Sequence, residues 1–170
     1  DKIDENCIRP VFNDADLFTI KVQVKTTGLS TVEDKYKAFI KQAIRARKDY
    51  RGSGTPTMFT TEDALTEMLL LEDVMGRPLY TDEAALARKL RVAKIVTIPE
   101  MEGLKGVKGG DLAAVIVNLA DYTVGADKGG AVSMFDDFDI DFNAQKYLIE
   151  TRCSGALTSP YSAMAIEWAA

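Results

Sequence analysis

The chain has 170 residues, a formal net charge of −5, and apolar and charged fractions of 46% and 28%. This composition is ordinary for a globular domain, and the acidic balance argues against a general nucleic-acid binder, whose phosphate contacts need a basic excess. The sequence has no histidine, which excludes Ser-His-Asp and Cys-His catalysis and imidazole metal sites. No apolar run reaches transmembrane length. The sequence also shows no secretory signal peptide, which would have a basic start, an apolar stretch and a cleavage site of small residues. We therefore expect neither membrane insertion nor secretion. The two cysteines, Cys7 and Cys153, fit no zinc pattern and are expected to be reduced thiols.

The first regular elements are a strand and a long helix. Apolar and polar residues alternate over Phe18–Lys25, which predicts a half-buried strand. Ser30 and Glu33 have the spacing of a capping box, and the helix that follows is expected to run to about Tyr50, before Gly52. Its apolar stripe at helical spacing is Val32, Tyr36, Phe39, Ile40, Ala43 and Ile44.

A basic face adjoins that stripe. Between residues 31 and 51 the basic residues outnumber the acidic ones; they are Lys35, Lys37, Lys41, Arg45, Arg47, Lys48 and Arg51. A charge run of this kind commonly marks a solvated helix surface. The alternative interpretation is a docking face for the acidic surface of another subunit.

The middle of the chain alternates helices and strands. We expect strands at 57–60, 92–98, 112–119 and 122–125, and helices at 62–71 and 82–90 capped by Thr61 and Thr81. The run at 112–119 is almost wholly apolar, as in a central strand that is covered on both faces. Gly103–Gly110 is expected to be a flexible loop, because it lacks the pattern of a phosphate loop or of a dinucleotide fingerprint.

The last part of the chain suggests strands only. Asp137, Asp139, Asp141 and Asn143 alternate with Phe138, Ile140 and Phe142, which predicts a strand with one acidic and one buried aromatic face. The segment does not match a calcium-binding loop of the EF-hand type. A loop that starts at Asp137 would need Gly at its sixth position and Glu at its twelfth, where this chain has Phe142 and Leu148. Two further strands, ending at Leu157 and Trp168, would complete an antiparallel meander. Lysine or arginine from a neighbour is expected opposite the stacked carboxylates.

These elements predict an α+β fold of mixed type. A body over 30–125 would contain a central sheet flanked by helices, and residues 1–29 and 126–170 would form a second, strand-rich piece. No nucleophile lies in a pattern with an activating base. We therefore expect no enzyme activity, no cofactor and no metal site.

Two stretches resemble the major capsid proteins of tailed double-stranded DNA bacteriophages, the Hong Kong ninety-seven fold. The first runs from Gly54-Thr-Pro-Thr-Met-Phe through Leu70–Tyr80 to Lys94-Ile-Val-Thr-Ile-Pro99. The second runs from Phe135 to Ile166. The order and spacing of these segments, over about residues 30–168, carry the resemblance.

The resemblance implies that residues 30–125 are the axial domain and that residues 1–29 and 126–170 are strands of the peripheral domain. The Gly103–Gly110 loop would lie toward a five-fold or six-fold centre of the shell. The N-terminal arm, extended loop and spine helix of the family are missing from this sequence. We therefore expect it to be the C-terminal portion of a longer protein.

The family also suggests one candidate site. Some members cross-link their subunits by an isopeptide bond between a lysine and an asparagine, assisted by a glutamate. Asn143 and Glu150 fall at matching places, although a bulge near Ala144 would be needed to bring them to one face of a strand. The alternative is that Asn143 simply ends the acidic face.

The implied function is that of a structural capsid subunit that associates with copies of itself into pentamers and hexamers around double-stranded DNA. Its other partners would be a scaffolding protein, a maturation protease and a portal, and it would reside in the virion and in the host cytoplasm during assembly. One alternative is the shell of an encapsulin-type nanocompartment. Another is a small cytosolic ligand-binding or enzyme domain, which would need a deep pocket with titratable groups.

Overall fold

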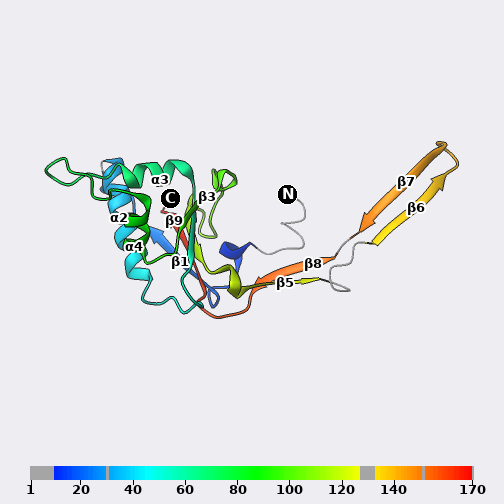
Figure 1. The fold of residues 1–170 in the computed structure, drawn as a ribbon, viewed down its shortest axis with the longest axis horizontal. Coiled ribbons are helices and arrows are strands. Elements are labelled where there is room, and N and C mark those ends of the chain that lie inside the picture. Colours follow the sequence, from blue (N-terminus) through cyan, green and yellow to red (C-terminus); the bar gives the residue numbers. More distant parts are fainter. Residues whose placement is uncertain (1–9, 30, 127–132, 151, 170) are drawn as a thin grey trace. The chain divides into compact units, whose positions relative to one another are not determined.

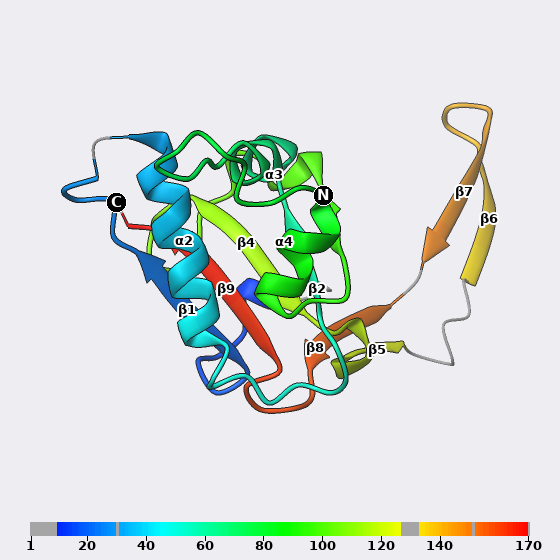
Figure 2. The ribbon, with the colours of Figure 1, turned by 60° about the vertical axis from the view of Figure 1, so that its left-hand side comes forward.

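A five-stranded mixed sheet lies at the centre of the larger of two units, which is formed by Val11–Tyr122 and Leu157–Ala170. The computed structural model describes residues 10–29, 31–126, 133–150 and 152–169. The sheet strands are β1 (Thr19–Val24), β2 (Thr57–Thr60), β3 (Ile95–Thr97), β4 (Leu112–Val117) and β9 (Ala163–Trp168). Their order is β1-β9-β4-β2-β3 (Figures 1 and 2). β1 and β9 are parallel, as are β2 and β3, whereas β4 is antiparallel to both β9 and β2.

The position of β9 corrects the domain boundaries expected from the sequence. β1 and β9 were expected to form a strand-rich piece with residues 126–156, but they complete the sheet of the helical body. The division at 30 and 125 is therefore wrong for these two strands. Burial explains the difference: Met164 and Ile166 are 0% exposed on one face of β9, and the small Ala163 and Ala165 fill the other. A strand buried on both faces belongs at the centre of a sheet.

Three helices cover one face of the sheet: α2 (Val32–Ala46), α3 (Glu62–Leu69) and α4 (Glu83–Leu90). All three predicted helices are thus confirmed, with shifted ends. Thr31 replaces Ser30 as the cap of α2 and accepts a hydrogen bond from the Asp34 N–H at 3.2 Å. Asp82 replaces Thr81 as the cap of α4, and its carboxylate accepts from the Ala85 N–H at 2.6 Å. Each new cap lies one residue nearer the helix. In α2, Phe39, Ile40 and Ala43 of the predicted apolar stripe are buried, whereas Val32 and Ile44 are 51% and 36% exposed.

Phe39 of α2 anchors the core between helices and sheet. It is 1% exposed and packs against the Trp168 ring, with a centroid separation of 5.7 Å. Tyr36 meets the same indole edge-on at 5.4 Å. This contact joins the first helix to the last strand, and aromatic pairs of this geometry contribute about 1 kcal/mol beyond their area burial.

A second apolar cluster covers the opposite face of the sheet. It contains Leu112, Val115 and Val117 of β4 with Leu157 and Met101. Short 3-10 turns cover it, namely η1 (Val11–Asn13) and η2 (Pro99–Met101), and Phe12, Phe18 and Phe59 pack at its edge. The prediction that β4 is covered on both faces is therefore confirmed.

The smaller unit contains, in its described part, two pairs of strands. β5 (Tyr122–Ala126) pairs with β8 (Cys153–Leu157), and β6 (Ser133–Asp139) pairs antiparallel with β7 (Ala144–Glu150). The predicted meander of three strands is therefore wrong beyond the β6–β7 hairpin. The chain turns at 140–143, where Asn143 has a φ of 47°, and the expected strand ends at Asp139. Asn tolerates this left-handed conformation better than most residues, which makes it a turn former here.

A polar network fixes the loop between α2 and β2. Asp121 is the last residue of η3 (Leu119–Asp121), directly before β5, and is 6% exposed. Its carboxylate accepts from the Ser53 N–H at 2.8 Å and from the Ser53 hydroxyl at 2.7 Å. The Asn118 side chain donates to the Ser53 carbonyl at 2.6 Å. These bonds tie the loop to the end of β4.

We expect Asp121→Ala to lower the free energy of unfolding by about 2 kcal/mol, because it removes the two hydrogen bonds that the buried Asp121 carboxylate accepts from Ser53. Asp111→Ala is the matched control. Its ion pair with Lys105 is more than half exposed, and such pairs are worth roughly 0 to 1 kcal/mol. Urea unfolding of the two variants checks the difference, and equal losses would contradict the structural role of the network.

Candidate functional site

We first searched the described residues for metal-binding clusters, free thiols and membrane-spanning helices. They contain no group of three or more His, Cys, Asp or Glu side chains placed to hold a metal ion. Cys153 is a free thiol, whereas Cys7 lies outside the described residues. No helix among the described residues has both the length and the apolar character that a membrane span requires. The candidate site described below is therefore an interaction surface, made by the β6–β7 hairpin and by a groove beside α2.

Glu167 of β9 is a buried carboxylate that the sequence analysis did not single out. It is 1% exposed, and one of its oxygens accepts from the Lys108 N–H at 3.1 Å. A Cβ on Gly106 would lie 2.0 Å from the Glu167 Cδ, so only glycine allows this approach. The segment Gly103–Gly110, expected to be a flexible loop, is therefore held at its centre by the last strand. In the sequence, a single acid in this strand could not be told from an exposed residue.

Asn143 and Glu150 are not brought together by the fold. Asn143 lies in the turn of the hairpin, and Glu150 is the last residue of β7, opposite Ser133. Seven residues of extended strand separate them by roughly 20 Å. Glu150 instead pairs with Arg152, with an Nη2–Oε1 distance of 2.9 Å. The cross-linking role stays a prediction from the resemblance, and the hairpin geometry gives it no support.

The β6–β7 hairpin presents apolar side chains to solvent. Its register puts Met134 beside Ile149, and Asp136 beside Tyr147, on one face. The exposed fractions of Met134, Tyr147 and Ile149 are 62%, 64% and 68%. The predicted burial of the aromatic residues is wrong within this chain, since Phe138 is 51% exposed and Phe142 80%. An exposed apolar surface of this kind marks an interaction site.

The acidic side chains of the hairpin do meet a cation. Asp137 and Asp139 lie on the face opposite to Met134, and Lys146 stands across from Asp137. Lys146 forms an ion pair with Asp139. The expectation that a lysine or arginine would face the stacked carboxylates is therefore confirmed, and the cation comes from the same hairpin.

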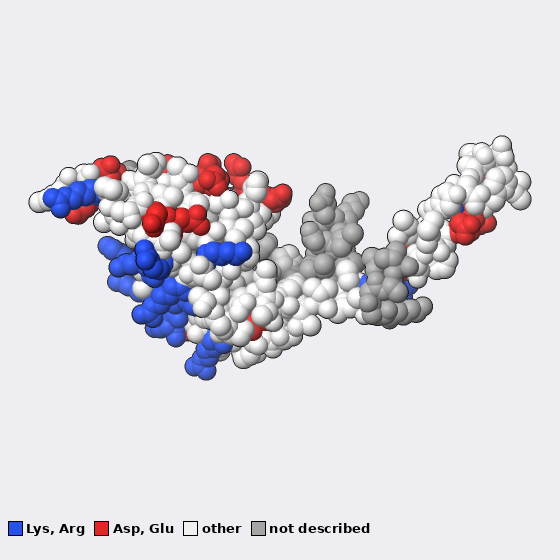
Figure 3. Space-filling model, viewed as in Figure 1, with Lys and Arg blue, Asp and Glu red and all other residues white. Residues whose placement is uncertain are grey.

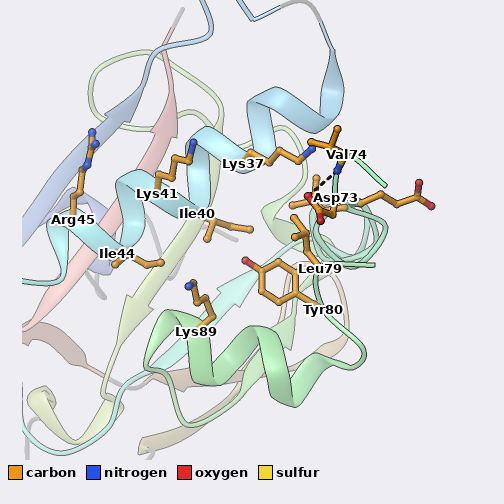
Figure 4. A pocket seen from close by; sticks show the side chains of 12 residues that line it. Lys37, Ile40, Lys41, Ile44, Arg45, Asp73, Val74, Leu79, Tyr80 and Lys89 are labelled. Atoms are coloured by element: carbon orange, nitrogen blue, oxygen red, sulfur yellow. Dashed lines mark hydrogen bonds between the residues drawn. The ribbon is translucent and has the colours of Figure 1, made fainter. Parts of the chain in front are cut away.

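A groove of about 600 Å³ lies between α2, α4 and the segment that joins α3 to α4 (Figure 4). Its apolar lining is Ile40, Ile44, Leu71, Val74, Leu79 and Tyr80. Its cations are Lys37, Lys41, Arg45 and Lys89. Within the described residues, Lys37 pairs with Glu33 at 3.3 Å, while no ion pair involves Lys41, Arg45 or Lys89. The groove joins an apolar floor to a basic rim.

The charges of the larger unit are segregated. Lys and Arg gather on the lower left side of the unit and Asp and Glu along its upper edge (Figure 3). Lys41 and Arg45 of α2 are exposed, as is Lys48, which follows the helix. Surfaces of opposite sign on one molecule favour contact between copies and disfavour wrong partners.

Three tyrosines have a pKa raised above the ordinary value of 10.0, with burial as the first cause. Nearby Glu67 and Asp63 raise the pKa of Tyr36 further, whereas Arg47 opposes the rise at Tyr50. The pKa of Tyr80, which lines the groove, is raised by burial alone. In each case the folded state favours the neutral phenol.

The pKa values of these three tyrosines are higher in the folded than in the unfolded chain. Their neutral phenols therefore contribute to the stability of the folded state below about pH 10, and this contribution is lost as the pH rises through the folded pKa values. We expect the free energy of unfolding to fall between about pH 9 and about pH 11, and to fall less in Tyr36→Phe and Tyr80→Phe. Tyr147→Phe, at a side chain 64% exposed, is the control. Urea unfolding at the two pH values measures this, and identical slopes in all variants would contradict the assignment.

Comparison with known proteins identifies the fold. The sequence matches no known family, and no curated protein matches it either. Among solved structures, the chain is similar to the capsid of an empty gene transfer agent (GTA) particle, with a TM-score of 0.55 and 14% identity over 96% of this chain and 54% of that one. It is also similar to the mature capsid of bacteriophage PhiM1, with a TM-score of 0.54 and 12% identity over 87% of this chain and 51% of that one. The chain thus has a capsid fold and spans about half the length of these structures.

Proposed function

We propose that this chain, whose fold is that of phage capsid proteins, is a structural subunit of a phage or prophage icosahedral capsid. The observation that carries the proposal is the likeness to the GTA capsid over 96% of the chain.

Self-association into pentamers and hexamers is the mechanism we propose. Shell subunits need large interfaces, and stable interfaces bury on the order of 1,600 Å² or more. In this proposal, the exposed apolar side chains of the β6–β7 hairpin and the basic side of α2 take part in such interfaces. Copies of the chain related by rotation would cover them.

The two units correspond, in this proposal, to the two domains of the family. Val11–Tyr122 and Leu157–Ala170 would be the axial domain, and the described part of Thr123–Ala156 would be the peripheral domain. These bounds replace those expected from sequence, because β1 and β9 complete the sheet of the larger unit.

The remaining partners follow from the shell role. The capsid would enclose double-stranded DNA without sequence-specific contacts, and the net charge of −5 fits a wall that does not hold the DNA tightly. A scaffolding protein, a maturation protease and a portal would act on it during assembly in the host cytoplasm. The finished subunit would reside in the virion.

The proposal is tested with protein expressed from its complete reading frame beside its genomic neighbours. We expect particles of megadalton mass by light scattering that protect double-stranded DNA from nuclease. Particles that hold a protein cargo and no DNA would indicate an encapsulin-type shell instead. A monodisperse small species under all conditions would overturn the proposal.

A further inference from the structure

A small cleft lies between the end of β1 and the helix α2, on the side of α2 that adjoins the edge of the sheet. Its volume is about 300 Å³, and its basic side chains are Lys25, Lys41 and Arg45, all exposed. Among the described residues, no aspartate or glutamate lines this cleft, and none of its three cations forms an ion pair. The cleft is therefore a concentration of uncompensated positive charge on an acidic chain.

Two of the cations come from one face of α2. Lys41 and Arg45 are four residues apart, so their side chains are neighbours on the helix surface, where like charges repel each other. The acids Glu33 and Asp34 lie in the first turn of the helix, roughly 10 Å back along its axis. Figure 4 shows the charged ends of Lys41 and Arg45 pointing away from Tyr80 on the other side of the groove. An anion bound between β1 and α2 relieves this repulsion.

The cleft also offers neutral hydrogen-bond donors. Gln42 lines it from α2 and is half-buried. On the other side, β1 is an edge strand, and the Val24 carbonyl accepts from the Ala169 N–H at 2.8 Å on the inner side of that strand. Neighbouring residues of a strand direct their backbone groups to opposite sides. The Gln23 N–H is therefore directed to the open edge of the sheet, beside the cleft.

Phosphate is the anion that this set of donors suits. The fork of an arginine binds two phosphate oxygens at once, and a lysine adds a compact charge with rotatable donors. A volume of about 300 Å³ lies near the lower end of the range for ligand sites, so the cleft admits phosphate groups more readily than a whole cofactor.

We propose that the cleft between β1 and α2 binds phosphate groups, with Lys41, Arg45 and Gln42 on the helix side and Lys25 on the strand side. The phosphates have two possible sources, the backbone of double-stranded DNA and free phosphate compounds. The inference does not depend on the proposed shell function, because every group in the cleft belongs to one copy of the chain.

Isothermal titration calorimetry with inorganic pyrophosphate tests the site in protein from the complete reading frame. We expect a Kd of about 1 mM or tighter at low ionic strength. Lys41→Gln with Arg45→Gln is expected to raise the Kd roughly tenfold or more, because the charge-assisted hydrogen bonds from α2 are lost. Lys25→Gln removes the cation of the opposite side and is expected to raise the Kd roughly threefold or more.

Two further variants separate a site from a general effect of charge. Lys89→Gln removes one positive charge from the neighbouring groove but not from the cleft, so the Kd should change by less than about twofold. Gln42→Met keeps the net charge and removes only the amide, and it is expected to raise the Kd roughly threefold. Thermal unfolding confirms that all variants fold, since the substituted side chains are exposed or half-buried on the surface of α2, α4 and the end of β1.

A short DNA duplex, followed by fluorescence anisotropy, distinguishes the two sources. Duplex binding that Lys41→Gln with Arg45→Gln weakens, and that Lys89→Gln leaves in place, assigns the cleft to backbone phosphates. Pyrophosphate binding with this pattern, in the absence of duplex binding, assigns it to free phosphates. If neither probe binds, or if Lys89→Gln weakens binding as much as Lys25→Gln does, the inference is overturned. Shell formation is scored separately, so its failure would overturn the proposed function and leave this result intact.

Discussion

Gly110→Ala is expected to destabilise the larger unit by about 3 kcal/mol and to lower its thermal midpoint by roughly 10 °C. A Cβ at this position would lie 1.7 Å from the Trp168 carbonyl oxygen, which is a backbone atom. The Trp168 N–H donates to the Asp111 carbonyl at 2.9 Å, so residues 110–111 run directly beside the end of β9. Relief of the clash requires a shift of the end of β9, an inner strand of the sheet.

Gly109→Ala provides the matched control. Gly109 has a φ of 87° and nothing within 4 Å of its added Cβ, so alanine meets only backbone strain there, worth about 1 kcal/mol. Calorimetry of the unassembled subunit compares the two substitutions one residue apart. A smaller effect at Gly110 than at Gly109 would show that the loop does not approach β9 as closely as the structure places it.

Ile166→Ala is expected to lower the free energy of unfolding of the larger unit by about 4 kcal/mol. Ile166 is 0% exposed at the centre of β9, where it pairs with Val22 of β1 and Ala114 of β4. The truncation leaves a cavity among residues of the helix-covered core. Because β9 is an inner strand of that sheet, the loss should appear in the cooperative unfolding of the whole unit.

The same substitution on the hairpin is the control for this effect. Ile140→Ala removes a side chain that is 84% exposed, so the stability of the unassembled subunit should change by less than about 0.5 kcal/mol. Urea unfolding followed by circular dichroism and by the fluorescence of Trp168 measures both. If Ile166→Ala altered the fluorescence transition but left the helical transition in place, β9 would not belong to the helical core.

The helices were predictable because their signals are local. Thr61 followed by Glu62 and Asp63, and the spacing of Phe39, Ile40 and Ala43, depend only on neighbours in sequence. Their ends moved by a few residues because several adjacent residues can serve as caps, as Thr31 does in place of Ser30.

The sheet order could not be predicted in the same way. β1 and β9 are separated by more than a hundred residues, and nothing in either strand specifies a parallel partner at that distance. Neighbouring strands at the end of the chain suggested a meander because sequential strands usually pair. The small Ala163 and Ala165 of β9, beside its apolar Met164, were the signal that β9 is an inner strand.

The candidate site was partly visible in the sequence. The basic face of α2 was identified as either a solvated surface or a docking face, and the structure places Lys41 and Arg45 at the rim of a groove. The groove itself needed the fold, because its lining comes from α2, the 71–80 segment and Lys89 of α4. Glu167 was missed because a single acid in a strand has the same pattern as an exposed residue.

The central claim is that this chain builds a shell, and electron microscopy of negatively stained protein from the complete reading frame tests it most directly. The account predicts uniform closed particles whose surface divides into five-fold and six-fold capsomers. Protein that folds, shows the expected unfolding behaviour and yet forms neither rings nor closed particles, alone or with its genomic neighbours, would contradict it.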